Sequence, residues 1–512
     1  MYDATWLLRA YASRRLSRLK RLNPEEVQQG VLRSLVHRAR GTRFALQHEF
    51  GAIRTLGDYR ECVPIRTYEE FWDNYWRDSF PRLVDCTWPG TIPYFALSSG
   101  TTRGVTKYIP ISREINRANA RAVADLLVHH VENRPDSRVL AGRCFMLGGS
   151  TGLTRQERGV YSGYLSGIAA AVRPAWTGPR YFPPRHLEGI ADWETKVERF
   201  ARSSLRQDIR AVGGTPSWLL IYFDRLLEIA GDGDGRIASV YPDLELLIHG
   251  GVAWAPYRDR FDALLEGTAA ETREVYPASE GFFGVADGAD GAGLRLLLDN
   301  EIFYEFLPES DLGAREPDCR WIGDAEMGVN YALVISTGAG LWRYLVGDTV
   351  TLVSRDPPRV LVTGRTSYTL SAFGEHVIGA ELERAVSESA KMIGATVDDF
   401  AVGSLFSERS GERGGHLFVV EFSDPKVDTA QVRTFATGVD SVLMRLNEDY
   451  AAHRADGWGL DPPRVAVLPP GGFVAWMKGR GKLGGQNKVP RVINDTELFG
   501  TLRKLAREFP LR

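Results

Sequence analysis

The sequence predicts a mixed α/β protein with at least two domains, and three observations support this fold class. The chain has 512 residues, which is too long for one ordinary hydrophobic core. Strand-like and helical stretches alternate through the middle of the chain, whereas residues 290–363 are mostly strand-like, which predicts an α/β body with an appended β subdomain. After Gly364-Arg365 the pattern changes to that of a compact α+β unit. We therefore expect two domains, over residues 1–364 and 365–512.

Apolar periodicity and helix-breaking residues set the expected elements. Two amphipathic helices are expected within residues 5–40, the second beginning at Pro24. Further helices are expected over 115–131, 193–210, 217–230, 256–265, 379–391 and 428–447. Strands are expected over 139–147, 244–248, 294–298, 302–307, 331–336, 399–405 and 416–422.

The composition narrows the classes of function. Lysine and arginine total 63 against 65 aspartate and glutamate, a net charge of −2, which argues against nucleic acid or an anionic membrane surface as a general partner. The four cysteines lie far apart, which favours free thiols in a reducing cytoplasm over disulfides or a zinc site. No secretory signal is evident, and no apolar run approaches the ~18 residues of a membrane span. We expect a cytoplasmic protein with no membrane partner and no obligate protein partner.

The stretch from Ser98 to Lys107 combines two hydroxyl pairs, two glycines and a lysine in ten residues between strand-like flanks. Glycine allows close approach of the backbone to a ligand, and amides, hydroxyls and lysine all donate to anionic oxygens. A phosphate-binding turn is one interpretation, and a solvated hairpin loop is the other. The spacing does not match the Walker pattern. This stretch alone therefore leaves both interpretations open.

Five glycine-punctuated motifs follow one another along the chain. They are Ser98 to Lys107; Tyr276-x-x-Ser279-Glu280; Arg343-Tyr344-x-x-Gly347-Asp348; Gly364-Arg365 followed by Gly374-Glu375 and Glu381; and Lys488-Val489-Pro490-Arg491. In this order they resemble the core motifs of adenylate-forming enzymes, and their variants look most like the Gretchen Hagen family of auxin-responsive acyl-acid amido synthetases. The resemblance covers nearly the whole chain.

This resemblance implies an adenylate-forming ligase that uses ATP and Mg2+. Such an enzyme activates a carboxylic acid to an acyl-AMP, releases pyrophosphate, and passes the acyl group to an amine, usually an amino acid. It also implies the adenylate-forming fold, with a large N-terminal domain that includes a β-barrel-like subdomain and binds ATP and the acid. The small C-terminal domain would be mobile and would carry Lys488. An acyl-CoA or aryl-CoA ligase sharing the adenylation step is the nearest alternative.

The resemblance also implies roles for individual residues. The ATP phosphates are assigned to the opening loop, at Ser98, Ser99, Gly100, Thr101 and Thr102, with Lys107 either donating or bracing the loop. Glu280 matches the position linked to Mg2+ and the nucleotide, and Tyr276 and Ser279 belong to the same nucleotide motif. Asp348 matches the carboxylate that accepts from the ribose hydroxyls, a pairing that suits an ionised acceptor. Arg343 would brace Asp348 or approach phosphate.

The remaining assignments concern the adenine, the hinge and the C-terminal lysine. Gly250 and Gly251 precede the region expected to edge the adenine, with His249 as a structural histidine. Gly364-Arg365 resembles the hinge, although Ser367 stands where such enzymes commonly carry aspartate or lysine. Lys488 matches the lysine that bridges the substrate carboxylate and the α-phosphate, and Lys478 and Lys482 compete for that role. Glu375 and His376 are candidate bases for the amine only by position.

The last candidates are the residues of an acyl pocket and a motif that favours a different function. Residues 151–176 supply a possible apolar wall, in which the candidates are Leu153, Arg155, Tyr161 and Tyr164. Residues 148–152 match the G-x-S-x-G elbow of a serine hydrolase or acyltransferase with Ser150 as the nucleophile, but a charged stretch follows where an elbow requires a packed helix. Residues 479–484 match a dinucleotide fingerprint that lacks its following helix.

Overall fold

The computed structural model describes most of the chain, and its contacts divide the chain into two compact units. The described residues are 2–98, 106–148, 151–190, 193–231, 235–251, 254, 257–288, 291–366, 369–370, 372–375, 377–406, 413–424, 426–455, 459–480 and 489–509. The first unit comprises Met1–Ser98, Lys107–Trp254 and Phe261–Thr366, and the second comprises Ser367–Arg512 with two short earlier pieces, of which Thr106 and residues 257–260 are described. The division between Thr366 and Ser367 lies two residues after the predicted boundary.

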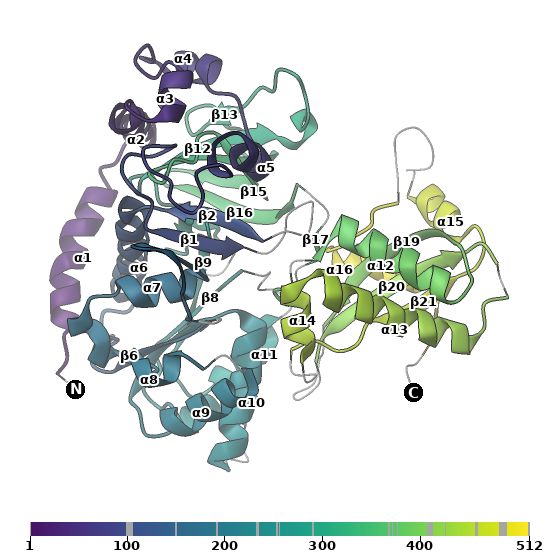
Figure 1. Cartoon of the computed structure of the whole chain (residues 1–512). Helices are drawn as coiled ribbons and strands as arrows, with labels where there is room; N and C mark the ends of the chain where they lie inside the picture. The colour runs from purple at the N-terminus through teal and green to yellow at the C-terminus, as the bar shows by residue number, and fades with distance from the viewer. Residues whose placement is uncertain are drawn as a thin grey trace. The chain divides into compact units, whose positions relative to one another are not determined.

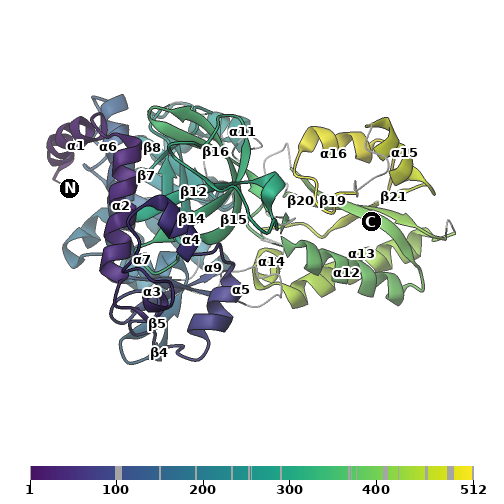
Figure 2. The ribbon, with the colours of Figure 1, turned by 90° about the horizontal axis from the view of Figure 1, so that it is seen from above.

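The first unit is built on one large mixed sheet (Figures 1 and 2). Within the described residues this sheet has twelve strands. Its strands run in the order β13-β12-β14-β15-β16-β11-β10-β9-β8-β7-β3-β6. From β9 to β6 neighbouring strands are parallel, and from β13 to β9 they are antiparallel. The bounds are β3 (Arg143–Leu147), β6 (Tyr181–Phe182), β7 (Ile209–Gly214), β8 (Leu246–Gly250), β9 (Glu271–Ala278), β10 (Gly281–Val285), β11 (Leu294–Leu296), β12 (Ile302–Pro308), β13 (Arg320–Trp321), β14 (Asn330–Thr337), β15 (Tyr344–Arg355) and β16 (Pro358–Arg365). The strand-rich region expected as a β subdomain therefore continues the same sheet as the parallel strands.

Helices of the first unit pack on this sheet and on one another. The helix α6 contacts β10 and is itself contacted by α1, and α2 lies beside β12 (Figure 2). The sequence defines α6 locally, because Ser112 Oγ accepts a hydrogen bond from the Ile115 amide at 3.1 Å and caps the helix. The bounds are α1 (Thr5–Leu19), α2 (Pro24–Ala39), α3 (Arg43–Gln47), α4 (Leu56–Cys62), α5 (Tyr68–Phe71), the π-helical turn η1 (Trp72–Trp76), α6 (Arg113–Asn133), α7 (Leu165–Val172), the 3-10 turn η2 (Ala175–Arg180), α8 (Arg185–Glu188), α9 (Trp193–Ser204), α10 (Pro216–Ala230), the 3-10 turn η3 (Ile237–Ser239), α11 (Arg258–Leu265) and the 3-10 turn η5 (Glu309–Asp311).

A second sheet of the first unit carries the opening loop. Its strands run in the order β2-β1-β5-β4, with bounds β1 (Tyr94–Ser98), β2 (Lys107–Ile111), β4 (Thr154–Glu157) and β5 (Val160–Gly163). The strands β1 and β2 are antiparallel and pair Ser98 with Lys107, whereas β5 runs parallel to β1. The predicted phosphate loop therefore connects two paired strands, and its residues 99–105 lie outside the described residues.

The second unit is an α+β structure with its own core. Its larger sheet has the order β19-β20-β21-β22, and α12 packs against α13. The core side chains include Val402, Phe418, Phe435 and Leu443, all buried. The bounds are β17 (Thr369–Leu370), β18 (Val377–Ile378), α12 (Gly379–Met392), β19 (Val397–Leu405), β20 (Gly415–Phe422), α13 (Thr429–Leu446), α14 (Glu448–Arg454), β21 (Arg464–Leu468), α15 (Gly472–Gly479), α16 (Thr496–Arg503) and β22 (Arg507–Phe509).

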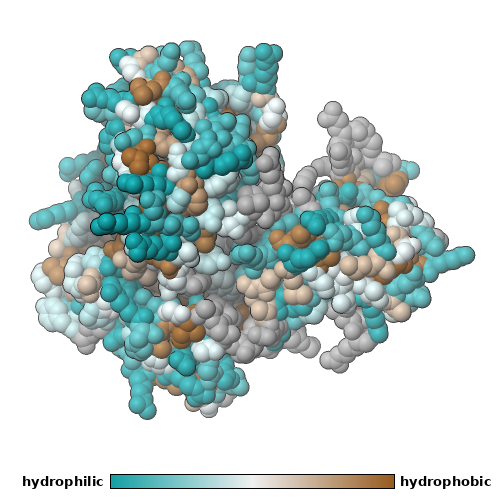
Figure 3. Space-filling view, in the orientation of Figure 1, coloured by the Kyte–Doolittle hydropathy of each residue, from teal (hydrophilic) through white to brown (hydrophobic). Residues whose placement is uncertain are grey.

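The expected helices and strands are confirmed as elements, and two of their ends lie more than two residues from the expected position. The helix expected over 193–210 ends at Ser204, because Ile209 already begins the buried strand β7. The strand expected over 139–147 begins at Arg143. The molecular face in Figure 3 is largely hydrophilic with scattered hydrophobic residues. In the described part of the chain, no helix combines the length and apolar character needed to cross a membrane.

Candidate active site

The carboxyl ends of the parallel strands bring several predicted residues to one edge of the large sheet. Strand pairing aligns Leu147 of β3 with Gly214 of β7, Gly214 with His249 of β8, and His249 with Glu274 of β9. Open α/β sheets bind ligands at this edge, beyond the carboxyl ends of their strands. Strand β8 ends at Gly250, with Gly251 directly after it, and β9 is followed by the Ser279-Glu280 turn, which connects β9 to β10. The fold therefore gathers two of the predicted nucleotide motifs.

Gly250 is required by its surroundings. A Cβ at this position would lie 2.3 Å from the carbonyl oxygen of Val275 on the neighbouring strand, closer than any side chain permits. The ring of His249 is buried and stacks on Trp254 with ring centres 3.7 Å apart and planes 14° apart. This packing supports the structural role expected for His249, and it leaves the glycine backbone as the part of the motif that a ligand can approach.

Glu280 is held by a tyrosine that the sequence interpretation did not single out. Its carboxylate is 7% exposed, and its Oε1 accepts a hydrogen bond from the Tyr344 hydroxyl at 3.1 Å. Burial, followed by the nearby Glu280 charge, raises the pKa of Tyr344 well above its ordinary value of 10, so the phenol stays a donor. The only signal in the sequence was the place of Tyr344 in the same motif as Asp348.

Asp348 is held by the other nucleotide-motif tyrosine. The Tyr276 hydroxyl donates to Asp348 Oδ2 at 2.7 Å, and the Tyr276 ring packs edge-on against Phe283 at 4.9 Å. The backbone before Asp348 is also defined, because Gly347 adopts a φ of +97° and its carbonyl accepts from the Thr366 amide at 2.8 Å. A residue with a side chain rarely adopts that φ. Asp348 is thus fixed from both its side chain and its backbone.

Arg343 lies in a different environment from the two that were predicted. Its guanidinium is buried and donates through Nε to Glu305 Oε2 at 3.0 Å and through Nη1 to the Val63 carbonyl at 2.9 Å. These contacts pair Arg343 with Glu305 rather than with Asp348. The expectation that Arg343 braces Asp348 or approaches phosphate is corrected accordingly: its geometry is that of a core ion pair beneath the motif.

The two described ends of the opening loop are Ser98 and Lys107, and their surroundings bear on the role of Lys107. Ser98 ends β1 opposite Lys107, and the Lys107 ammonium lies over the Tyr68 ring at 5.3 Å from its centre. Tyr68 in turn accepts from the Tyr108 amide at 2.9 Å, so this corner is tied together. That geometry supports the bracing role for Lys107. Of the predicted triphosphate donors, Ser99, Gly100, Thr101 and Thr102 lie outside the described residues.

Two of the predicted acyl-pocket residues, Arg155 and Tyr161, lie on the sheet that carries the opening loop, whereas Leu153 directly precedes β4 and Tyr164 directly precedes α7. Arg155 of β4 pairs with Tyr161 of β5, and the Tyr161 ring stacks near Tyr94 of β1 at 6.2 Å. Leu153 packs partly buried against the large core cluster, while Tyr164 is 40% exposed. The structure therefore places Tyr161 beside β1 and Leu153 against the core, and the role of all four residues as an acid pocket stays a prediction.

The serine-hydrolase alternative is not supported by the local fold. Its elbow requires a helix directly after the nucleophile. Ser150 itself lies outside the described residues, but the chain after it forms the strands β4 and β5 instead of a helix. The described residues directly after the motif thus do not form the helix that an elbow requires.

The structure describes some of the candidate residues after residue 365, whereas others lie outside the described residues. Lys488, Lys482, Ser367 and His376 lie outside the described residues, and Lys478 is exposed in the last turn of α15. Glu375 is fully buried and accepts from His416 Nε2 at 2.7 Å and from the Phe373 amide at 2.7 Å. Burial opposes its charge, but the His416 charge and these donors outweigh burial and lower the pKa of Glu375. Glu375 is therefore a structural anion and a poor candidate for the base.

The donor set fits a magnesium ion that arrives with a nucleotide. Among the described residues, no group of three or more His, Cys, Asp or Glu side chains could hold a metal on its own. Mg2+ in nucleotide enzymes is held by one or two carboxylates together with phosphates and water. The single carboxylate of Glu280 at the sheet edge meets that requirement.

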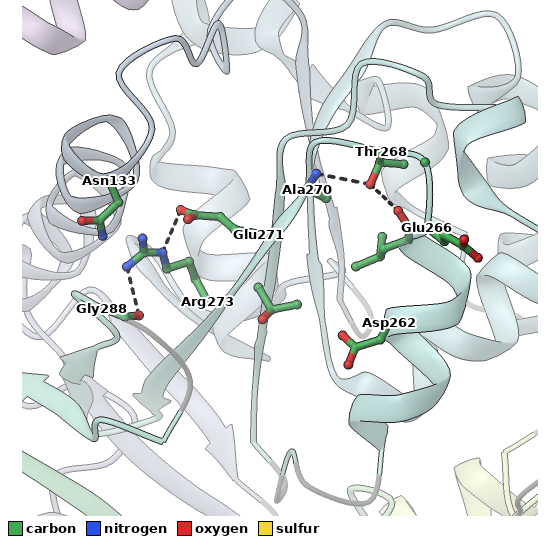
Figure 4. Close-up of a pocket in the computed structure, with 11 residues that line it drawn as sticks. Asn133, Asp262, Glu266, Thr268, Ala270, Glu271, Arg273 and Gly288 are labelled. Carbon is green, nitrogen blue, oxygen red and sulfur yellow. Dashed lines mark hydrogen bonds and ion pairs between the residues drawn. The ribbon is translucent and has the colours of Figure 1, made fainter.

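A separate cavity lies at the opposite end of β9. It measures about 570 Å³ and is lined by Asp262, Glu266, Glu271 and Arg273 among others (Figure 4). The Arg273 guanidinium points to Glu271 and to the Gly288 carbonyl. Glu271 begins β9 whereas Glu280 follows its end, a span of roughly 30 Å at about 3.3 Å per residue. This cavity is thus distinct from the candidate active site.

Comparison with solved structures defines the class of fold. The structure is similar to the GH3.15 acyl acid amido synthetase, with a TM-score of 0.59, 17% sequence identity and 96% of both chains covered. It is also similar to 2-hydroxyisobutyryl-CoA ligase in complex with 2-HIB-AMP and CoA, with a TM-score of 0.56, 17% identity and coverage of 94% and 91%. The fold is that of the adenylate-forming enzymes.

Family models identify the chain further. Residues 14–270 match the GH3 family N-terminal domain, residues 295–365 the GH3 family central domain, and residues 380–497 the GH3 family C-terminal domain. The chain belongs to the GH3 family, the Gretchen Hagen family that its motifs resemble. This finding confirms the resemblance.

Relatives by sequence are amido synthetases, ligases that form a C–N bond. Indole-3-acetic acid-amido synthetase GH3.3 from Arabidopsis thaliana is 25% identical over 52% of this chain and 47% of its own length. GH3.8 from Oryza sativa subsp. indica is 28% identical over 51% of this chain and 46% of its own length. In these matches the chain spans about half the length of the relative. GH3.4 from Arabidopsis thaliana is 22% identical over 94% of this chain and 91% of its own length.

Proposed function

We propose that this chain is an ATP-dependent acyl-acid amido synthetase. It activates a carboxylic acid as an acyl-AMP with release of pyrophosphate, and it then transfers the acyl group to an amine of the amino-acid class. The observation that carries the proposal is the meeting of Glu280 and Asp348, from two motifs far apart in sequence, through the tyrosine hydrogen bonds of Tyr344 and Tyr276. Membership in the GH3 family and the amido synthetases among its relatives support the second half-reaction.

Each group of residues contributes a separate part of the binding. Asp348 accepts the ribose hydroxyls, since an ionised carboxylate offers acceptors alone. Glu280 holds Mg2+, which when bound neutralises phosphate charge and orients the α-phosphate. Ser98 to Thr102 donate to the phosphates, and the backbone at Gly250 and Gly251 edges the adenine. Tyr276 lies along the adenosine, with Ser279 beside it in the turn.

The acid and the second domain complete the proposal. Leu153, Arg155, Tyr161 and Tyr164 contact the acid, with the arginine available to its carboxylate. Lys488 bridges the acid carboxylate and the α-phosphate during adenylation, and residues 365–512 move as a domain between the two half-reactions. The four cysteines are free in the structure, which supports a reducing cytoplasm as the place of the reaction.

Acid-dependent exchange of labelled pyrophosphate into ATP tests this function. A panel of aliphatic, aromatic and indolic acids should give exchange with at least one member, and an Asp348→Asn variant should reduce it. Product mass with an amino-acid panel, compared with coenzyme A as the acceptor, then separates amide from thioester formation. A folded wild-type chain that exchanges with none of the acids would overturn the proposal, and a thioester product would move the chain to the CoA ligases.

A further inference from the structure

Two motifs of equal spacing hold each other's carboxylates. Tyr276 and Glu280 are four residues apart, as are Tyr344 and Asp348. Each tyrosine donates to the acid of the other motif, with Tyr276 to Asp348 at 2.7 Å and Tyr344 to Glu280 at 3.1 Å. The hydrogen bonds are therefore reciprocal, and they connect residues 72 and 64 positions apart.

The strand order shows that β9 and β15 are not neighbours in the sheet, so side chains make the connection between the two motifs. Between β9 and β15 lie β10, β11 and β16. Four strand spacings of about 4.8 Å would keep β9 and β15 roughly 19 Å apart in a flat sheet. The two hydrogen bonds therefore require the sheet to curl between β9 and β15. Loss of these hydrogen bonds would remove two direct contacts that hold the carboxylates in place.

We propose that Tyr344 is a positioning residue that holds Glu280 in the orientation that receives Mg2+ with ATP. The inference rests on the proposed function and adds a residue to which that function gave no role. Its observed basis is the buried Tyr344–Glu280 hydrogen bond together with the reciprocal Tyr276–Asp348 bond.

Tyr344 is itself held rigidly, as a positioning residue must be. Its side chain is fully buried and packs against the Phe71 ring at 6.1 Å. The backbone beside it is fixed, because the Leu345 amide donates to the Arg66 carbonyl at 2.9 Å and the Arg66 amide donates to Arg343 at 3.0 Å. A rigid donor selects one orientation of the flexible glutamate side chain. Hydrogen bonds to an ionised group are also about twice as strong as neutral ones.

The matched pair of variants is Tyr344→Phe and Tyr304→Phe. Each removes one phenolic oxygen from a fully buried ring in the same unit. The Tyr304 hydroxyl donates to the Phe283 carbonyl at 3.2 Å, so its loss leaves the carboxylates untouched. Both variants should lose some thermal stability, and only Tyr344→Phe should change the response to Mg2+.

Calorimetric titration of the full chain with α,β-methylene-ATP, at several Mg2+ concentrations, measures this response without turnover. Tyr344→Phe should raise the Mg2+ concentration at half-saturation by about tenfold, as expected for the loss of one hydrogen bond to a charged group. Tyr304→Phe should match the wild type. In a double variant with Glu280→Gln, the Tyr344→Phe change should add little, since the two side chains act together.

The outcomes separate this inference from the proposed function. If Tyr344→Phe leaves the Mg2+ response unchanged, or if Tyr304→Phe alters it equally, the positioning role is overturned. If the wild type binds Mg2+ with the analogue, and Tyr344→Phe weakens that binding, yet no acid supports pyrophosphate exchange, then the amido synthetase function fails and the positioning role stands. A wild type that does not bind the nucleotide overturns both.

Discussion

The guanidinium of Arg343 donates through Nε to Glu305 Oε2 at 3.0 Å, and both side chains are buried. Glu305 also accepts from Arg60 Nε at 2.9 Å, which gives a buried carboxylate two cationic partners. Arg343 directly precedes Tyr344, the donor to Glu280. The ion pair thus anchors the chain at the start of the motif that carries Tyr344 and Asp348, and its effect on nucleotide binding is indirect.

Replacing Arg343 should therefore cost stability before it costs binding. Arg343→Met should lower the free energy of unfolding by about 3 kcal/mol, the lower end of the range for breaking a buried pair, because Arg60 remains with Glu305. Urea denaturation measures the loss. The double variant Arg343→Met with Glu305→Leu should recover part of it, since no charge is then left unpaired by Arg343. A variant of wild-type stability that no longer binds ATP would instead indicate direct contact with the nucleotide.

Removing the Tyr276 hydroxyl should weaken ATP binding with little change in stability. The Tyr276→Phe ring keeps its packing on Phe283, but Asp348 loses the donor at 2.7 Å. A hydrogen bond to a charged group contributes about 1.5 kcal/mol, so the KM for ATP should rise about tenfold. The KM for the acid serves as the internal control and should stay constant. An equal rise in both constants would argue for a general loss of structure.

Asp348→Asn should specifically reduce recognition of the ribose. The wild type should prefer ATP over 2′-deoxy-ATP or 3′-deoxy-ATP, because in the proposed function Asp348 accepts from the ribose hydroxyls. The variant should discriminate about tenfold less, corresponding to the loss of a charged acceptor. Competition of the three nucleotides in pyrophosphate exchange provides the comparison. Unchanged discrimination would remove Asp348 from the ribose site.

The sequence predicted much of the secondary structure and several site residues, for physical reasons. Buried strands such as β8 and β14 are continuous apolar runs, and helices such as α6 begin with a capping residue, so both are encoded locally. Glu280 and Asp348 belong to short motifs, and the resemblance of these motifs to those of adenylate-forming enzymes singled the two residues out. Their pairing with Tyr344 and Tyr276 depends on how a curled sheet brings distant strands together.

Arg343 illustrates what local sequence could not supply. Its partner Glu305 lies 38 residues earlier on β12. The residues next to Arg343 in the sequence do not indicate whether its guanidinium pairs with a buried carboxylate or with a phosphate. The same limit applies to Glu375, whose position near the hinge suggested a base while its buried contact with His416 makes it structural. Contacts between elements decide such roles, and they follow from tertiary packing.

Stability should vary with pH through a buried histidine and two carboxylates in the first unit. His130 Nδ1 lies 2.6 Å from Glu271 Oε1, and its Nε2 lies 4.0 Å from Glu245 Oε2. Burial alone would lower the pKa of His130, but the neighbouring carboxylates of Glu245 and Glu271 outweigh burial and raise it above 6.5. Burial alone would raise the pKa of each carboxyl, but His130 and the other donors lower both pKa values to about 2.

The sign of each effect follows from these shifts. The stabilising contribution of His130 is complete below pH 6.5 and is lost as pH rises through its raised pKa. The contributions of Glu245 and Glu271 are complete above pH 4.5 and are lost as pH falls toward 2. Urea denaturation from pH 3 to 9 should therefore show greatest stability at about pH 4.5–6.5. His130→Gln should flatten the alkaline side and keep the acidic decline; an alkaline side of unchanged slope would contradict the assignment.

The two half-reactions should respond differently to the loss of Lys488. In adenylation the acid carboxylate approaches a phosphate of like charge, and one unit charge at about 4 Å with an effective dielectric of 20 is worth roughly 4 kcal/mol. Lys488→Ala should therefore slow acid-dependent pyrophosphate exchange by roughly 100- to 1,000-fold. Amide formation from supplied acyl-AMP should stay within about threefold of the wild type, because the acid is then already activated.

Lys478→Ala is the matched control, since this exposed lysine at the end of α15 lies ten residues earlier, and it should leave both rates unchanged. Equal loss of both half-reactions in Lys488→Ala would indicate a structural role, and a selective adenylation defect in Lys478→Ala would transfer the bridging role to that residue.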